Sequence, residues 1–339
     1  MLAAVAYVVP AANSLPRRPP AGVRKVSVPA AGRAFDTSRR TRVVGRGTAA
    51  SCTSAAVVAA VRSGGIITFA CGPKPVTIRM RATAKVVNTS ARVVLDGGGL
   101  VTLSGGGLQR ILYMDTCDQA QVWTTSHCQD QSAPELVVQN MTFTDGDSSG
   151  QSFDGGGGGA IFARGGRLRI IDSTFVRNRC DPDGPDIGGG AVRALSQSRG
   201  LPVYVVGSRF SANACSNGGA LSSIGVSWTV LNSRFSDNRA IGNGANPARA
   251  GTAGGGSGGA IYNDGDRMTL SIGGSEFAGN HANEGGGAIF FVSDDRSGTM
   301  AIRHSTLERN RSVGFQTAGL PGIFFLGARV PTVAESVLG

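Results

Sequence analysis

Apolar and polar positions alternate in a register that recurs six times along the chain. Each copy is marked by one large apolar residue, and apolar residues also stand five and seven positions before it. The six large residues are Phe143, Phe175, Phe210, Phe235, Phe277 and Leu307. Five positions earlier stand Val138, Ile170, Val205, Val230, Ile272 and Ile302. Seven positions earlier stand Leu136, Leu168, Val203, Trp228, Leu270 and Met300. A period of two predicts a short β-strand with one buried face in every copy.

Turn-forming residues flank the large apolar residue on both sides. Three positions before it stand Asn140, Asp172, Gly207, Asn232, Gly274 and His304. These residue types adopt positive φ more readily than others, which predicts a recurrent sharp bend. Three positions after it stand Asn178, Asn213, Asn238, Asn280 and Asn310, with Gly146 in the first copy. If the copies stack, we expect the asparagine side chains to form a hydrogen-bonded ladder.

A second motif, Gly-Gly-Ala followed by an aliphatic residue, falls between the large apolar residues. It begins at Gly158, Gly189, Gly218, Gly258 and Gly286. The large apolar residues of successive copies are 25 to 42 residues apart, a spacing typical of solenoids and propellers. A propeller blade needs four antiparallel strands joined by hairpins, and these copies carry bends in place of hairpin turns. The pattern therefore favours a parallel β-helix of roughly seven to nine rungs, stacked about 4.8 Å apart.

The paired motifs Gly-Gly-Ala-aliphatic and Phe-x-x-Asn resemble the repeats of chlamydial polymorphic outer-membrane proteins. They are also similar to those of secreted bacterial β-helix proteins of the pectate-lyase-like superfamily. The resemblance covers residues 85–325 and implies an all-β, right-handed parallel β-helix, a hand that parallel crossovers also favour. It further implies an adhesin-like role or a carbohydrate-directed surface. The catalytic motifs of the related lyases and hydrolases are not intact in this sequence, so the resemblance implies no particular reaction.

The sequence on either side of the regular copies predicts three further segments. Residues 54–62 form an amphipathic pattern that predicts a short helix, with Ser54 as its N-cap and Gly64 as its stop. Such a helix would cover the open N-terminal end of the solenoid. We therefore expect a β-helix domain over residues 51–329, with its cap at 51–84 and regular rungs at 85–325. Residues 1–50 are expected to be a signal-like remnant and flexible leader, and residues 330–339 a tail.

Charge is concentrated in the expected leader. Of the formal charge of +11, residues 1–50 contribute nine basic side chains and one acidic one. A nucleic-acid-binding domain would concentrate basic residues on a folded face, so we expect no nucleic-acid partner. The apolar run at residues 2–9, followed by Pro10-Ala11-Ala12, is typical of the end of a secretory signal. No run of about 18 apolar residues occurs, so no membrane-spanning helix is expected.

The six cysteines also indicate an oxidising compartment. They form no Cys-x-x-Cys motif and no metal-binding spacing with histidine, so their even number predicts disulfides. Cys180 and Cys215 each stand five positions after a large phenylalanine, which places them above one another in successive rungs. Stacking brings their Cα atoms to about 5 Å, inside the range for a disulfide. By elimination and proximity, we expect Cys52 to pair with Cys71 and Cys117 with Cys128.

Acidic residues in two neighbouring loops form a candidate calcium site. The first loop contains Asp145, Asp147 and Asp154, and the second contains Asp181, Asp183 and Asp186. Calcium takes about six to eight oxygen ligands, and stacked loops can bring carboxylates together. The alternative is ordinary turn chemistry, because aspartate next to glycine and proline is common in loops. The later acidic residues Asp264 and Asp294 are interpreted as solvated turn residues.

Arginines at outward positions form a candidate substrate-binding set. This set is Arg177, Arg179, Arg209, Arg234, Arg239 and Arg311. Guanidinium groups in a column suit carboxylates or sulfates spaced along a polymer. The alternative is that arginine is simply the default surface cation, since the chain has only 3 lysines among its 33 basic residues.

Two function classes follow from these patterns. The first is a secreted or cell-surface solenoid, expected to be a monomer, that binds polysaccharide or another surface polymer without catalysis. The second is a polysaccharide lyase or epimerase acting on an acidic, uronate-containing polymer, with calcium as its expected cation. The feature that separates them is whether acidic residues and arginines line one groove.

Overall fold

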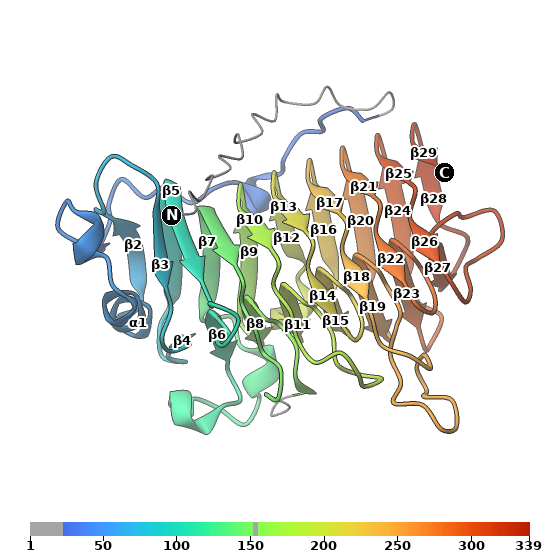
Figure 1. Cartoon of the computed structure of the whole chain (residues 1–339), viewed down its shortest axis with the longest axis horizontal. Helices are drawn as coiled ribbons and strands as arrows, with labels where there is room; N and C mark the ends of the chain where they lie inside the picture. The colour runs from blue at the N-terminus through green and yellow to red at the C-terminus, as the bar shows by residue number, and fades with distance from the viewer. Residues whose placement is uncertain (1–22, 152–154) are drawn as a thin grey trace, which may run out of the picture.

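The strands of this chain stack into a parallel β-helix, which confirms the expected fold class (Figure 1). The computed structural model describes residues 23–151 and 155–339. Every pairing between named strands of these residues is parallel, and like positions of successive copies lie opposite each other. Phe175, for example, pairs with Phe143 on one side and with Phe210 on the other. The register inferred from the sequence is therefore the register of the rungs.

The largest sheet has 17 strands and consists of two ladders that share the long strands β5 and β7. The first ladder runs through β1 (Arg42–Val44), β2 (Gly65–Phe69), β5 (Arg92–Ser104), β7 (Glu135–Thr144), β9 (Arg167–Ile171), β12 (Val203–Val206), β16 (Trp228–Leu231), β20 (Thr269–Gly273), β24 (Thr299–Arg303) and β28 (Thr332–Ala334). The second adds β3 (Val76–Arg79), β10 (Thr174–Val176), β13 (Arg209–Ser211), β17 (Arg234–Ser236), β21 (Glu276–Ala278), β25 (Thr306–Glu308) and β29 (Val337–Leu338).

Two smaller sheets complete each rung. The eight-stranded sheet contains the strands that follow the Gly-Gly-Ala motifs. Its members are β4 (Ala84–Lys85), β6 (Leu112–Asp115), β8 (Ile161–Arg164), β11 (Val192–Leu195), β15 (Leu221–Ile224), β19 (Ile261–Gly265), β23 (Ile289–Ser293) and β27 (Ile323–Leu326). The four-stranded sheet contains β14 (Ala214–Cys215), β18 (Arg239–Ala240), β22 (His281–Ala282) and β26 (Arg311–Ser312).

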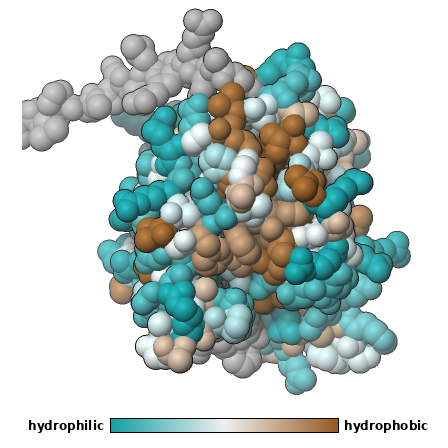
Figure 2. Space-filling model, turned by 90° about the vertical axis from the view of Figure 1, so that its right-hand side faces the viewer, coloured by the Kyte–Doolittle hydropathy of each residue, from teal (hydrophilic) through white to brown (hydrophobic). Residues whose placement is uncertain are grey.

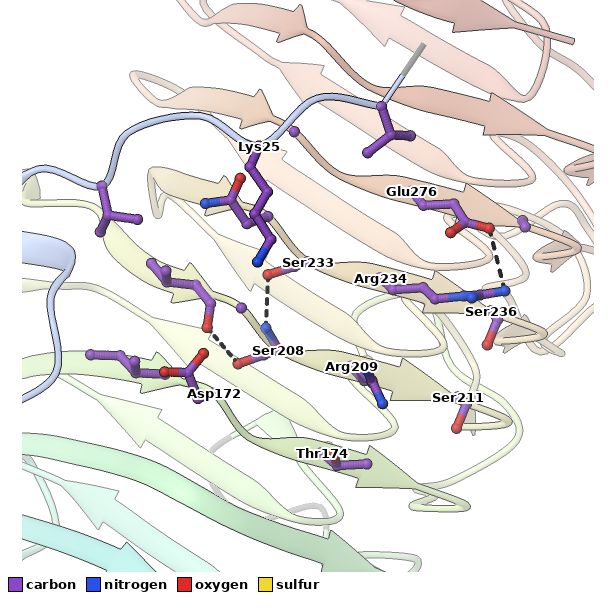
Figure 3. A pocket seen from close by; sticks show the side chains of 18 of the residues that line it. Lys25, Asp172, Thr174, Ser208, Arg209, Ser211, Ser233, Arg234, Ser236 and Glu276 are labelled. Atoms are coloured by element: carbon purple, nitrogen blue, oxygen red, sulfur yellow. Dashed lines mark hydrogen bonds and ion pairs between the residues drawn. The ribbon is translucent and has the colours of Figure 1, made fainter. Parts of the chain in front are cut away.

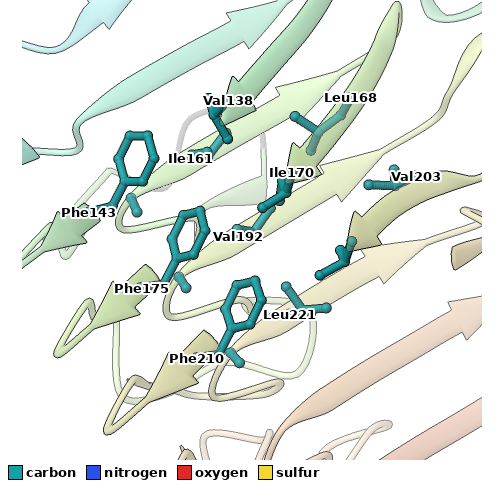
Figure 4. Close-up of a cluster of buried hydrophobic side chains, with 14 of the residues drawn as sticks. Val138, Phe143, Ile161, Leu168, Ile170, Phe175, Val192, Val203, Phe210 and Leu221 are labelled. Atoms are coloured by element: carbon teal, nitrogen blue, oxygen red, sulfur yellow. The ribbon is translucent and has the colours of Figure 1, made fainter. Parts of the chain in front are cut away.

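The core is a column of aromatic rings inside the second ladder. The five phenylalanines of the repeat are fully buried, and their rings stack with centroids 4.5 to 4.9 Å apart. Figure 4 shows three of these rings in one row, facing Ile161, Val192 and Leu221 of the eight-stranded sheet. Each rung thus repeats the same apolar environment, which is why the same residue types recur at the same positions.

Two ladders of polar side chains run beside this aromatic column. The expected asparagine ladder is present: each Oδ1 accepts from the backbone N–H and the side-chain amide of the preceding asparagine. The second ladder was not expected from the sequence. In it, each serine hydroxyl accepts from the N–H of the serine one rung earlier, at 3.1 Å. The residues are Ser173, Ser208, Ser233, Ser275, Ser305 and Ser336.

The sharp bends expected three positions before the large apolar residue are also confirmed. Asn140, Asp172, Gly207, Asn232, Gly274 and His304 all have φ between 45° and 61°. Glu335 occupies the same place after one more rung, with φ of 49°. It is followed by the ladder residue Ser336 and by Leu338, which pairs with Leu307. Residues 332–338 are therefore a seventh copy of the repeat, and the expectation of a tail at 330–339 is wrong.

The N-terminal end of the solenoid is covered by the single α-helix of the described residues. Helix α1 (Ser54–Ser63) begins after Thr53, whose hydroxyl accepts from the N–H of Ala56, so the N-cap is Thr53 and not Ser54. It ends at Gly64, as expected, with φ of 66°. Val57 and Val61 bury its apolar side against the first rungs. Short 3₁₀ turns occur at η1 (Ala30–Gly32), η2 (Ala49–Ser51), η3 (Gln119–Gln121), η4 (Cys128–Asp130) and η6 (Ser198–Gly200).

Residues 23–41 form an extended segment, here called the strap, that runs along the outside of the solenoid (Figure 1). Its first residues contact the last rungs, where the N–H of Arg24 donates to the carbonyl of His304. Its last residues lead into β1, which pairs with β2 near the other end. The expectation of a flexible leader is therefore wrong for residues 23–50, because contacts hold them to the sheet. Residues 1–22, including the signal-like run, lie outside the described residues.

Side-chain amides hold the strap in place. The amide of Asn232 accepts from the N–H of Val26 at 2.9 Å and donates to its carbonyl at 3.0 Å. Gln139 makes the same pair of bonds with Phe35, at 2.8 and 3.0 Å. Each amide takes the place that a peptide group of a neighbouring strand would take. The strap is thus attached to the first ladder at the bend residue Asn232 and at Gln139, next to the bend residue Asn140.

All three expected disulfides are present. Cys180 is bonded to Cys215 across one rung, with the Cα atoms 4.9 Å apart. The other two bonds join Cys52 to Cys71 and Cys117 to Cys128. Three disulfides are consistent with an oxidising compartment.

Candidate functional site

A groove with a volume of about 1190 Å³ lies between the strap and the outer face of the large sheet (Figure 3). The strap forms one wall through residues 23–34, and strands from β10 to β21 form the floor. We call it the strap groove. Two of the six candidate arginines, Arg209 and Arg234, line it. They are direct neighbours on β13 and β17, so their guanidinium groups project from successive rungs into the same space.

The charges in the strap groove are mixed, with a basic excess. Arg234 forms an ion pair of 3.3 Å with Glu276 on the next rung. Lys25 enters from the strap, and within the described residues neither Lys25 nor Arg209 has a carboxylate within ion-pair distance. Burial raises the pKa of the Asp172 carboxyl, and the nearby charge of Lys25 offsets only part of that effect. Lys25 and Arg209 are therefore among the groove cations that an incoming anion could pair with.

The floor between these charges is neutral and hydroxyl-rich. The serines of the bend, Ser208 and Ser233, use their hydroxyls in the ladder described above. Ser211 and Ser236 stand two residues after Arg209 and Arg234 on the same strands, and they also line the groove. Hydroxyls next to guanidinium groups supply the donors and acceptors that a carbohydrate needs.

The remaining candidate arginines lie elsewhere. Arg177 binds Asp145 through two hydrogen bonds of 2.8 and 2.9 Å, and Arg179 binds Asp147 at 2.7 Å. Arg239 and Arg311 flank His281 in the four-stranded sheet. Burial lowers the pKa of His281, and the charges of these two arginines lower it further. The six arginines thus form separate groups, and the sequence did not reveal this division.

The candidate calcium ligands do not converge. Burial raises the pKa of both Asp145 and Asp147, but other contacts outweigh it and lower both values. For Asp145 the main contact is the hydrogen bond from Arg177. For Asp147 the hydrogen bonds from Ser149 come first, followed by Arg179. Asp181 accepts from the N–H of Gly150 at 2.8 Å, and Asp183 is exposed in the same loop. Asp154 lies outside the described residues. Over residues 23–151 and 155–339, no three acidic, histidine or cysteine side chains form a group that could hold a metal ion.

A polar cluster on the outer face of the eight-stranded sheet was missed by the sequence analysis. The amide Nδ2 of Asn246 lies 3.2 Å from an oxygen of Asp186 and 3.4 Å from one of Asp264. The hydroxyl of Tyr262 donates to Asp264 at 2.8 Å. Burial raises the pKa of the Asp264 carboxyl, and the charges of Asp294 and Asp186 add to this effect. Asp264 is therefore not the solvated turn residue that was expected.

Arg193 lies beneath the same cluster and is almost fully buried. Its guanidinium donates to the hydroxyl of Ser222 and to the carbonyl of Asp186. Burial lowers its pKa to about 10, although Tyr262, Asp186 and Asp264 oppose the effect. The buried guanidinium thus ties the backbone of Asp186 to strand β15, which carries Ser222. The sequence offered one signal for this cluster. Arg193 and Tyr262 occupy the same position in two of the strands that follow a Gly-Gly-Ala motif.

Comparison with known proteins finds no family model, no curated protein and no solved structure that matches this chain. The resemblance of its motifs to chlamydial and pectate-lyase-like repeats therefore stays a prediction. Among the described residues, no helix is long and apolar enough to cross a membrane.

Proposed function

We propose that this protein is a secreted or cell-surface β-solenoid that binds an acidic polysaccharide, or another anionic surface polymer, in the strap groove. The observation that carries the proposal is the pairing of Arg209 with Arg234 on neighbouring rungs. Lys25 reaches into the same groove from the strap (Figure 3). Rungs repeat at about 4.8 Å, so these cations form a short line. A line of cations binds a chain of carboxylates or sulfates better than an isolated anion.

The setting of the groove supports an extracellular role. Three disulfides close loops of 11, 19 and 35 residues, which favours folding outside the reducing cytosol. A solenoid offers a long, rigid surface that neither a small ligand nor a compact partner would fill. A role in adhesion or in the cell envelope fits both features.

Polymer binding is tested by titrating the protein with polygalacturonate, dextran sulfate and neutral dextran. We expect the two acidic polymers to bind and neutral dextran to fail, with affinity that falls as salt is raised. Substituting both Arg209→Gln and Arg234→Gln should lower the affinity about tenfold or more, because charge-assisted hydrogen bonds contribute about 1.5–3 kcal/mol each.

The matched control carries Arg239→Gln and Arg311→Gln, which remove the same charge from exposed positions outside the groove. This control should keep most of the affinity. Equal losses in the two double variants would show that net charge, and not the strap groove, governs binding. Absence of binding to either acidic polymer would reject the proposal.

A second function, cleavage or epimerisation of the same class of polymer, is favoured by the cluster around Asn246. One amide nitrogen lies within 3.4 Å of carboxylate oxygens from both Asp186 and Asp264. Burial raises the pKa of the Asp264 carboxyl, and a carboxyl with a raised pKa suits acid–base chemistry. In β-elimination a base removes the proton next to the uronate carboxyl, the glycosidic C–O bond breaks, and an acid protonates the leaving oxygen. Epimerisation instead returns a proton to the opposite face.

This second function is tested by following the absorbance of the unsaturated product on uronate polymers, with calcium and with a chelator. A signal that Asp264→Asn abolishes, while polymer binding persists, would support an enzyme. Absence of product under both conditions, together with unchanged uronate stereochemistry, would leave polymer binding as the function.

A further inference from the structure

The C-terminal end of the solenoid differs from the N-terminal end in having no helix over it within the described residues. Strands β27, β28 and β29 pair only with the preceding rung, whereas α1 packs on the first rungs. Figure 2 faces this end and shows apolar side chains gathered on it. Val330 is 80% exposed and Val313 is 55% exposed, values that are high for valine. This end therefore presents apolar surface that nothing in the described chain covers.

A pocket of about 500 Å³ opens on this apolar end. It lies between the loop that follows β26 and the turn that joins β27 to β28, and we call it the end pocket. Leu320, Phe325, Leu326 and Val330 supply its apolar lining. A volume of this size falls within the range of pockets that hold small ligands.

Two arginines, Arg296 and Arg329, also line the end pocket. Both are exposed, and neither guanidinium has an ion pair or side-chain hydrogen bond with another described residue. They sit on different turns, Arg296 after β23 and Arg329 after β27. Their convergence on one apolar pocket therefore results from the stacking of the rungs and not from closeness in sequence.

We propose that the end pocket binds an anionic amphiphile, namely a single acyl chain with a carboxylate or phosphate head group. The acyl chain would pack against Leu320, Phe325 and Leu326, where burial of apolar surface drives binding. The head group would pair with Arg296 and Arg329, since guanidinium groups bind carboxylate and phosphate oxygens in charge-assisted pairs. This site is separate from the strap groove and does not depend on the proposed polymer binding.

A second copy of the chain fits this end less well than an anionic ligand. Helix α1 covers the first rungs, so the arrangement to compare is two copies that stack through their C-terminal ends. A two-fold axis there would bring the same arginines of both copies together. Like charges at an interface oppose association, whereas an anionic head group neutralises them.

The proposal is tested by calorimetric titration of the full chain with dodecanoate and dodecyl phosphate, below their micelle concentrations. Dodecanol and acetate serve as probes that lack the charge and the chain, respectively. We expect saturable binding of both anionic amphiphiles, at least about tenfold weaker binding of dodecanol, and none of acetate. The paired substitutions Arg296→Gln and Arg329→Gln should remove the preference for the charged head, and Val330→Asp should weaken every chain-bearing probe.

Matched controls separate the end pocket from unspecific binding. Arg303→Gln removes an exposed charge from the same end of the solenoid but not from the pocket lining, and it should leave binding unchanged. Because all substituted residues are exposed, the variants should keep the melting temperature of the parent. Equal binding of dodecanol and dodecanoate, or equal loss in Arg303→Gln, would overturn the proposal. Light scattering that shows a dimer, and a monomer for Val330→Asp, would overturn the proposal in favour of a second copy of the chain.

Discussion

The side-chain oxygen of Asn213 accepts two hydrogen bonds from Asn178, one from the backbone N–H and one from the side-chain amide, both at 2.9 Å. The same amide of Asn178 also donates to the carbonyl of Phe143 at 3.2 Å. Each asparagine thus accepts hydrogen bonds from the backbone and side-chain N–H groups of the asparagine one rung earlier. These bonds join three rungs at a fully buried corner. Because no water reaches this corner, each lost partner leaves a polar group unpaired.

Replacing Asn213 by alanine should therefore lower the free energy of unfolding by about 2–4 kcal/mol, since it leaves more than one buried group without a partner. Asn213→Asp keeps the acceptor oxygen, but buries a charge and loses the donor, so it should destabilise at neutral pH and recover in part in acid. Urea unfolding at two pH values measures both effects. A loss below about 0.5 kcal/mol for Asn213→Ala would show that the ladder adds nothing to stability.

The aromatic column predicts a second loss of stability. Phe235 stacks between Phe210 and Phe277, with centroids 4.8 and 4.5 Å away, and has no exposed surface. Phe235→Ala should cost about 3–5 kcal/mol, because neighbouring rungs are too tightly tied to close the cavity. Ser236→Ala, on the outward face of the same strand, should change the free energy of unfolding by less than about 0.5 kcal/mol. Similar losses in both variants would contradict the inward orientation of the ring.

Much of the interior could be predicted from the sequence because stacking gives like positions like surroundings. The strands, the bends, the asparagine ladder and the Cys180–Cys215 bond all follow from that one repeat. The seventh copy was missed although Val333, Ser336 and Leu338 stand in register. In that copy a leucine replaces the usual phenylalanine, and the sequence ends before the expected asparagine, so the two most recognisable marks are missing.

The functional surface could not be predicted in the same way. The strap lies where it does because Asn232 holds Val26 and Gln139 holds Phe35, and neither contact recurs with the period. The cluster at Asp264 likewise depends on a long loop that brings Asn246 back over β19. Contacts that occur once leave no pattern in a sequence. The arginines were recognised as outward-facing, but only the strap divides those in a groove from those on an open face.

A single substitution at Asn232 should loosen the first part of the strap. Asn232→Gly removes the amide that binds both polar groups of Val26. It adds no backbone strain, because Asn232 has φ of 52° and glycine occupies the same place at Gly207 and Gly274. We expect faster hydrogen exchange and faster proteolysis at residues 24–28, with little change in the global melting temperature.

Asn283→Gly serves as the comparison for the strap, since its side chain bonds only to carbonyls of the loop after β18. It should leave the exchange of residues 24–28 unchanged. If Asn232→Gly also leaves their exchange unchanged, the amide contact does not hold the strap.

The pH dependence of stability should reflect Glu135, whose side chain is only 4% exposed. Burial opposes its ionisation, but the hydrogen bond from Arg92 and the charges of Arg169 and Arg167 outweigh burial and lower its pKa from 4.5. The folded state therefore binds this proton less readily than the unfolded state. The contribution of the Glu135 carboxylate to the free energy of unfolding is therefore complete above the unfolded-state pKa. It is lost as the pH falls through the lower pKa of the folded state.

Glu135→Gln should thus destabilise the protein by about 1–3 kcal/mol at pH near 7, because three arginines lose a shared partner. The difference from the parent should shrink as the pH is lowered below about 4.5. Glu308→Gln, which removes a longer and more exposed pair with Arg309, should show a small difference that varies little with pH. Denaturant unfolding of the three proteins from neutral to acid pH measures this. A constant penalty for Glu135→Gln across that range would mean that the carboxylate charge is not what stabilises the arginine cluster.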